Sequence, residues 1–274
     1  MEDQYKTRIS EEKCPECGAF IRYGSISAMG INKEFRLECP CMVEKREKER
    51  KENITSGVSV IRSAMREYSG MKTKQQSFFL DKIKPIEGQQ EAYKAAVAFV
   101  ERFSKDRHTT GILFSGGVGS GKTFITAAVA NAVIDMCHIS DDDAERAGKG
   151  IADRKYTPVR FTSTVELLEQ LKATYNAGSG TETAQNITDR LKKAPLLVLD
   201  DMGAEKPSEW VSERLFEIVD YRYNEELPVI ITTNATPQEL KQKIGERSFD
   251  RLREMCVFIP VTAKSQRQTA GKVV

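Results

Sequence analysis

The chain has 274 residues, of which 39% are hydrophobic and 30% are charged, and its 42 Lys and Arg nearly balance 40 Asp and Glu. These values describe a globular protein with one sizeable core, or a core and a small module, and they exclude a disordered or fibrous chain. No apolar run approaches the roughly 18 residues of a membrane span, and the first residues are acidic and polar, so we expect a cytoplasmic protein without a membrane partner.

Cysteines crowd into residues 1–43. Cys14-Pro-Glu-Cys17-Gly has the spacing of a zinc knuckle, in which two thiolates bind one ion, and Cys39-Pro-Cys41 follows with a single intervening residue. In a cytosolic chain this clustering favours a metal over disulfides. We therefore predict a zinc-ribbon-like module that binds Zn²⁺ through these four cysteines. A redox pair and an iron–sulfur site are the alternatives.

The segment between the two cysteine pairs contains two short runs that predict strands. Residues 19–23 and 33–37 could pair as a hairpin. Its aromatic side chains, Phe20, Tyr23 and Phe35, would form a miniature core, or alternatively a surface on which bases stack.

Residues 44–76 predict a charged helical linker. The run EKREKERKE at 44–52 has acids that nearly cancel its bases, which favours a solvated helix over a phosphate-binding arm. A helical apolar pattern follows, made of Val58, Ile61, Met65 and Tyr68. This face could pack on its own domain or on a partner helix. The polar stretch MKTKQQS at 71–77 marks the expected domain boundary.

From residue 77 to 274 the pattern alternates between strands and helices. We expect strands at 110–115, 158–162, 195–200, 228–232 and 256–261. We expect helices at 88–103, 122–137, 164–175, 208–224 and from Pro237 onward. Residues 139–157 and 176–186 are polar insertions. Strands separated by helices indicate an α/β domain with a parallel sheet.

The sequence GGVGSGKT lies between the first of these strands and the helix that follows it. Such a loop lets backbone N–H groups converge on a phosphate at the positive end of a helix. The lysine supplies a charge for the β- and γ-phosphates of ATP, and the threonine hydroxyl is a ligand for Mg²⁺. The predicted nucleotide-binding residues are Gly116, Gly117, Val118, Gly119, Ser120, Gly121, Lys122 and Thr123.

Two further strands end in polar residues that suit this chemistry. The apolar run at 195–199 leads into Asp200 and Asp201, where Asp200 would hold Mg²⁺ and Asp201 could polarise the attacking water. The run at 228–232 ends near Asn234, whose amide could reach the γ-phosphate, although a turn residue is an equal interpretation.

Together GGVGSGKT, LLVLDDMGAEKPSEW, VIITTN and ERSFDRLREM resemble the AAA+ ATPases of the DnaC/DnaI helicase-loader group, with the IstB transposition ATPases close behind. The resemblance covers about residues 77–268. It implies a P-loop AAA+ sheet flanked by helices, with Walker A at 116–123, Walker B at Asp200 and Asp201, and sensor 1 at Asn234.

The same resemblance implies roles for three arginines. Arg251 would be the arginine finger that reaches a neighbouring subunit's nucleotide, with Arg247 as its rival, and Arg267 would be sensor 2. A surface salt bridge or a charge at a helix end is the alternative for each.

Two departures from the general AAA+ pattern also matter. Walker B ends in Asp-Asp instead of Asp-Glu, so Asp201 would lie about one methylene further from the water, which suggests slow, switch-like hydrolysis. Only seven residues follow Arg267, so we expect no full helical lid domain. The nucleotide would then be held partly by the neighbouring subunit of a homo-oligomer that forms with ATP.

The function implied by this resemblance is an ATP-dependent loader that binds single-stranded DNA and delivers the hexameric replicative helicase. Because the net charge is only +2, DNA contact must come from local patches, for which we expect residues 160–164 and 172–186. The first 76 residues would grip the helicase. The alternatives are an IstB-like transposition targeting ATPase and a non-hydrolysing factor that assembles on single-stranded DNA.

Overall fold

The computed structural model of the chain describes residues 4–28, 31–150, 156–174 and 183–266. They form two compact units, one made of Met1–Ile61 with Ile139–Asp153 and the other of Arg62–His138 with Arg154–Val274. The domain limits expected at 43 and 76 stay predictions. None of the described helices is long and apolar enough to cross a membrane.

The first unit contains a three-stranded antiparallel sheet in the order β1-β2-β3. Its strands are β1 (Gln4–Lys13), β2 (Phe20–Ala28) and β3 (Ile31–Arg36). The expected hairpin is confirmed, since Tyr23 pairs with Arg36. The prediction that the aromatic side chains form a miniature core is wrong for Phe20, which is 53% exposed. Strand β1 was not expected, because its polar sequence carries no alternating apolar pattern.

One helix, α1 (Pro40–Tyr68), spans both the charged run and the amphipathic pattern. Glu, Lys and Arg are good helix formers, and nothing in the sequence breaks the helix between the two stretches. Ile61 and Met65 are buried within the chain, with 3% and 1% of their surfaces exposed. These two members of the apolar face therefore pack on the protein itself and are not available to a partner helix.

The polar insertion after residue 138 contains an unexpected helix, α4 (Asp141–Gly148). Ser140 caps it by accepting a hydrogen bond from the Asp143 backbone N–H at 3.2 Å. The serine followed by three aspartates is a helix-start signal, because acidic side chains favour the first turn.

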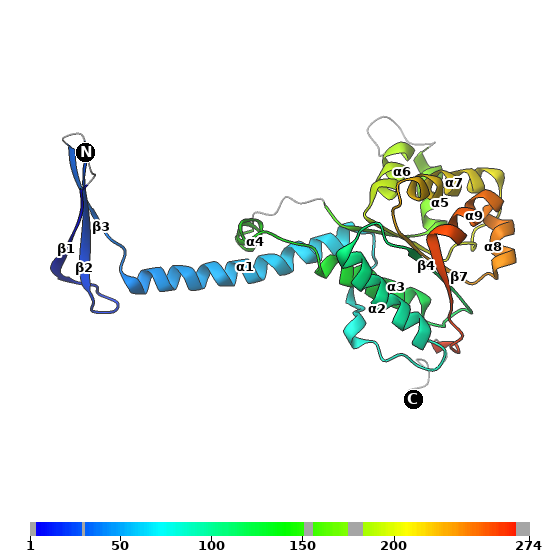
Figure 1. Cartoon of the computed structure of the whole chain (residues 1–274), viewed down its shortest axis with the longest axis horizontal. Helices are drawn as coiled ribbons and strands as arrows, with labels where there is room; N and C mark the ends of the chain where they lie inside the picture. The colour runs from blue at the N-terminus through cyan, green and yellow to red at the C-terminus, as the bar shows by residue number, and fades with distance from the viewer. Residues whose placement is uncertain (1–3, 29–30, 151–155, 175–182, 267–274) are drawn as a thin grey trace. The chain divides into compact units, whose positions relative to one another are not determined.

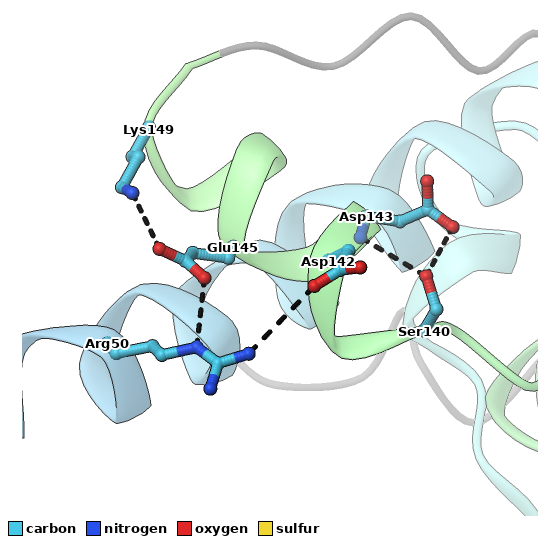
Figure 2. A network of polar contacts seen from close by, with 6 residues as sticks. All are labelled: Arg50, Ser140, Asp142, Asp143, Glu145 and Lys149. Carbon is cyan, nitrogen blue, oxygen red and sulfur yellow. Dashed lines mark hydrogen bonds and ion pairs between the residues drawn. The ribbon is translucent and has the colours of Figure 1, made fainter. Parts of the chain in front are cut away.

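Helix α4 packs closely against α1 within the first unit. A Cβ added to Gly57 of α1 would lie 1.7 Å from the Ala144 carbonyl oxygen, so only glycine permits this approach. Figure 2 shows the polar contacts beside it, where Arg50 Nε donates to Glu145 at 3.0 Å and Lys149 Nζ donates to the same carboxylate at 2.6 Å. The hydrogen bond from Lys149 lowers the pKa of Glu145 the most, and the one from Arg50 lowers it further.

The second unit is built on a parallel five-stranded sheet in the order β5-β6-β7-β4-β8. The strands are β4 (Gly111–Ser115), β5 (Val159–Ser163), β6 (Leu196–Asp200), β7 (Val229–Thr233) and β8 (Cys256–Pro260). All five expected strands are present, and the predicted α/β fold class is confirmed.

Helices cover both faces of this sheet, with α2 and α3 on one side and α7, α8 and α9 on the other (Figure 1). Their bounds are α2 (Gln90–Lys105), α3 (Lys122–Asp135), α5 (Thr164–Thr174), α6 (Ala184–Lys193), α7 (Glu209–Asn224), α8 (Pro237–Ile244) and α9 (Glu246–Met255). Successive strand residues alternate between the faces: Leu197 and Leu199 join the core beneath α5 to α9, and Val198 is buried on the other side.

Helices α6 and α9 were not expected. Each is mostly polar and buries only two large apolar side chains, Ile187 and Leu191 in α6 and Phe249 and Leu252 in α9. So short an apolar stripe is a weak periodic signal. Two 3₁₀ turns, η1 (Gln75–Ser77) and η2 (Leu80–Lys82), connect α1 to α2.

Candidate nucleotide site

The loop between β4 and α3 needs glycine at three positions. A Cβ on Gly116 would lie 2.1 Å from the Val261 carbonyl oxygen, and one on Gly119 would lie 2.2 Å from Ser265 Oγ. Gly121 has φ +98°, and a Cβ there would lie 2.4 Å from the Gln89 amide nitrogen. The segment after β8 and the residue before α2 thus press on the loop from outside. A Cβ added to Gly117 would meet no atom within 4 Å, and the side chain of Val118 is 59% exposed.

Lys122 begins α3 and directs its ammonium into this loop. It donates to the carbonyl oxygens of Gly116 and Gly117 at 2.7 and 2.9 Å and to Asn234 Oδ1 at 2.8 Å. The residue is only 5% exposed. A buried ammonium held at the mouth of a glycine loop provides a positive charge for an anionic ligand.

The hydroxyl of Thr123 points at the end of β6. Its Oγ1 donates to both carboxylate oxygens of Asp200, at 3.0 and 3.1 Å, and Thr232 Oγ1 donates to Asp200 Oδ1 at 2.6 Å. Burial raises the pKa of Asp200, and the two hydroxyl donors offset part of this rise. A divalent cation would stabilise the ionised carboxylate, so Thr123 and Asp200 fit the oxygen ligand set of Mg²⁺.

Asp201 and Asn234 also lie beside the loop. Asp201 adopts φ +55°, a conformation that non-glycine residues seldom take, and its carboxylate accepts from Asn234 Nδ2 at 3.0 Å. Asn234 therefore bridges Lys122 and Asp201 with its two amide atoms. This bridge is a more specific arrangement than an ordinary turn residue would make.

A cavity of about 690 Å³ opens over these groups. One wall comes from residues 72–78, most of which belong to the polar stretch at 71–77 that was expected to mark a domain boundary. In this wall Phe78 packs edge to face against Phe124 of α3, with ring centroids 4.5 Å apart. The described lining residues are Lys72, Lys74, Gln75, Phe78, Val118, Gly119, Gly121, Lys122, Thr123, Phe124, Asp201, Asn234 and Gln266. The two adjacent phenylalanines, Phe78 and Phe79, were the signal that could have indicated this wall.

The candidate arginine fingers lie on α9, and neither is among the described residues that line this cavity. Arg251 pairs with Asp220 of α7 at 2.5 Å, and its guanidinium lies 4.8 Å from the centroid of the Phe216 ring. Arg247 is exposed and lies 4.2 Å from the same ring. Within one chain, Arg251 therefore makes the salt bridge that was the alternative to a finger. Arg267 lies outside the described residues.

The four N-terminal cysteines converge in the first unit, with all four Sγ atoms within 4.8 Å of one another. Cys14 Sγ lies 3.7 Å from Cys41 Sγ, and Cys17 Sγ lies 3.3 Å from Cys39 Sγ. Four thiolates about 2.3 Å from a tetrahedral zinc ion would be spaced by about 3.8 Å, which these separations approach. Gly18 makes the knuckle turn with φ +72°.

The thiol environment also suits a cation. The backbone N–H groups of Cys17 and Glu16 lower the pKa of Cys14 to about 6. Hydrogen bonds to the Cys39 and Cys17 sulfurs favour the protonated Cys41 thiol and raise its pKa, and repulsion from the Cys14 thiolate adds to the rise. A divalent cation would remove that repulsion and allow all four groups to ionise.

The residues expected to contact DNA are partly engaged inside the protein. Arg160 Nη1 donates to the Tyr68 carbonyl oxygen, and its guanidinium lies 4.3 Å from the centroid of the Tyr68 ring. Lys172 Nζ lies 5.3 Å from the centroid of the Trp210 ring. Residues 175–182 of the second expected segment lie outside the described residues.

Comparison with known proteins supports a domain that binds ATP. Residues 145–272 match the family described as IstB-like ATP binding protein. The replicative helicase loader DnaC of Escherichia coli K12 is 29% identical over 167 residues, which cover 61% of this chain and 59% of DnaC. The crystal structure of the DnaC helicase loader matches with 26% identity and a TM-score of 0.52, covering 69% of this chain and 99% of that one. Residues 145–272 therefore resemble the IstB-like ATP binding proteins, and the chain as a whole is similar to DnaC-type helicase loaders.

The resemblance to helicase loaders is thereby confirmed, although the chain spans only 59% of DnaC's own length. A further relative, the phage-like element PBSX protein XkdC of Bacillus subtilis, is 27% identical over 249 residues, covering 89% of this chain and 78% of XkdC. This likeness reaches beyond the IstB/DnaC-like domain into the N-terminal unit.

Proposed function

We propose that this protein is an ATP-dependent helicase loader that holds single-stranded DNA and delivers a hexameric replicative helicase during initiation of DNA replication, in the cytoplasm. The observation that carries the proposal is the constellation of Lys122, Thr123, Asp200 and Asn234 on an IstB/DnaC-like domain. Relatives named as helicase loaders support the choice of DNA replication over other uses of this fold.

In this proposal each residue around the loop has a defined task. The backbone of residues 116–121 and the Lys122 ammonium bind the phosphates of ATP. Thr123 and Asp200 hold Mg²⁺, which supplies charge neutralisation for phosphoryl transfer. Asp201 orients the attacking water, and Asn234 reads the γ-phosphate. Arg267 would complete the site as sensor 2.

The N-terminal unit is proposed to grip the helicase. Its sheet and the first turn of α1 expose the large apolar side chains of Ile9, Phe20 and Met42, which are 68%, 53% and 58% exposed. Exposed apolar side chains on a small module suit a protein partner better than solvent. Zn²⁺ bound by the four cysteines would hold this surface in shape.

The proposal is tested by capturing a replicative helicase with the full chain and with a chain that lacks residues 1–43, a truncation that keeps the residues at 66–78 on which the nucleotide cavity depends. We expect the full chain to bind the helicase and the truncated chain to lose it, while ATP and single-stranded DNA binding persist in both. DNA binding should weaken steeply with salt, because backbone charge dominates it. Selective binding of duplex DNA, with no helicase captured, would instead favour an IstB-like transposition targeting ATPase, a function that the family match also supports.

Hydrolysis is predicted to require two chains, because Arg251 does not line the cavity of its own chain. Arg251→Ala and Lys122→Ala proteins should each be inactive alone and should regain part of the turnover when mixed, since one kind of mixed interface pairs an intact loop with an intact arginine. Phosphate release measured against protein concentration checks this. Full, concentration-independent turnover by Arg251→Ala would move the role to Arg247.

A further inference from the structure

A buried amide ties α3 to the wall of the nucleotide cavity. Asn131 has 0% of its surface exposed, and its Nδ2 donates to the carbonyl oxygens of Gln75 at 2.9 Å and Phe78 at 2.7 Å. Both acceptors belong to the segment that forms the cavity wall. Asn131 lies more than 50 residues away from that segment along the chain.

Arg66, in the last turn of α1, determines which way this amide points. Its Nε donates to Asn131 Oδ1 at 2.8 Å, which leaves the two N–H donors of Asn131 facing the wall. Arg66 is itself held by an ion pair between its Nη2 and Asp135 Oδ1 at 2.5 Å. Its side chain is only 13% exposed, so water competes weakly with these bonds.

The wall is held to α3 by these two bonds and to α5 by an exposed ion pair between Lys72 Nζ and Glu166 Oε2, which lie 3.6 Å apart. The 3₁₀ turn at 75–77 buries none of its residues. Phe78 follows this turn and packs its ring against Phe124, the residue after Thr123. The two hydrogen bonds from Asn131 to the carbonyl groups of Gln75 and Phe78 therefore position the Phe78 ring relative to the phosphate loop.

We propose that Asn131, oriented by Arg66, is a positioning residue that fixes residues 75–78 as the wall receiving the base of the bound nucleotide. The inference rests on the proposed ATP site. The loop, Lys122 and Asp200 account for the phosphates and their cation. The remaining wall of the cavity carries the two phenylalanine rings, which offer the apolar, aromatic surface that a base requires.

The test separates the base from the phosphates. In Asn131→Asp, a carboxylate keeps the acceptor for Arg66 but faces the Gln75 and Phe78 carbonyl groups with an oxygen instead of two donors. We expect ATP to displace a fluorescent ATP analogue about tenfold less well than from the wild type. Inorganic tripolyphosphate, which lacks the base and ribose, should bind both proteins equally.

Three further variants make this result specific. Arg66→Gln should weaken ATP binding about threefold, and Phe78→Ala should act on the wall directly even if Asn131→Asp does not fold. Arg62→Gln is the matched control, because Arg62 also joins α1 to α3, through the Asp135 carbonyl oxygen at 2.6 Å and a longer contact with Asp135 Oδ1 at 3.7 Å, but has no bond to Asn131 among the described contacts. It should leave both affinities unchanged.

Equal weakening of ATP and tripolyphosphate in Asn131→Asp would overturn the inference, because the amide would then support the whole domain. So would an equal effect of Arg62→Gln, or ATP binding that Phe78→Ala leaves intact. Lys122→Ala tests the proposed nucleotide site separately from the role of Asn131. If it binds ATP and tripolyphosphate as tightly as the wild type, the nucleotide site lies elsewhere and the proposed function fails first.

Discussion

Lys122→Ala is expected to lower the affinity for ATP about hundredfold while the protein stays folded. The ammonium is buried at the loop, where it donates to the carbonyl oxygens of Gly116 and Gly117 and to Asn234 Oδ1, so its removal takes away a positive charge that faces the phosphates. A charge-assisted hydrogen bond contributes about 1.5–3 kcal/mol, and about 2.8 kcal/mol corresponds to a hundredfold change in affinity. Equilibrium binding of a fluorescent ATP analogue measures the effect.

The matched control is Lys105→Ala, which removes an exposed lysine at the end of α2. It should bind ATP as the wild type does. Thermal unfolding of both variants verifies that the domain is intact. ATP affinity that is unchanged in a folded Lys122→Ala protein would falsify the assignment of the glycine loop as the phosphate site, and the roles proposed for Thr123 and Asp200 would fall with it.

Those parts of the site that the sequence predicted share one property: their geometry is local. The loop at 116–123 lies between a strand and a helix, and parallel strands end at one edge of a sheet, so Asp200 and Asn234 had to lie near Lys122 once the strands were recognised. The five strands were recognisable because their apolar runs are short and bounded by polar residues.

The parts that were missed depend on contacts between residues distant in sequence. Nothing in MKTKQQS shows that it forms a cavity wall, because that role comes from Asn131, which looks like one more residue of an apolar helix. Helix α4 lies in a polar insertion and carried a local start signal, Ser140 before three aspartates, but its packing partner could not be predicted. Its packing depends on Gly57 of α1. A single glycine in a charged helix normally indicates a less stable helix and gives no sign of a close contact with another helix.

Removal of zinc is expected to unfold the N-terminal module and leave ATP binding intact. Among the residues of this module whose side chains the structure describes, 7–25 and 34–39, Ile21 is the single large apolar side chain that is buried. One buried apolar side chain among these described residues offsets little of the entropy of folding, so we expect the metal to supply the rest. Structural zinc sites commonly supply about 10–16 kcal/mol of binding free energy, which here would be folding free energy.

The experiment compares the protein with and without a zinc-selective chelator, at a fixed excess of Mg²⁺. Hydrogen exchange should show loss of protection in β1, β2 and β3, with protection in the five-stranded sheet and ATP affinity unchanged. Cys17→Ser should reproduce the effect, and Cys137→Ser, a cysteine outside the cluster, should not. Metal analysis of the untreated protein should find one zinc per chain. Visible absorption from iron, or cysteines that react only after reduction, would replace zinc with the iron–sulfur or redox alternative. A module that stays protected without any metal would mean that backbone pairing and Ile21 suffice, and the exposed surface at Ile9 and Phe20 would then not depend on the cysteines.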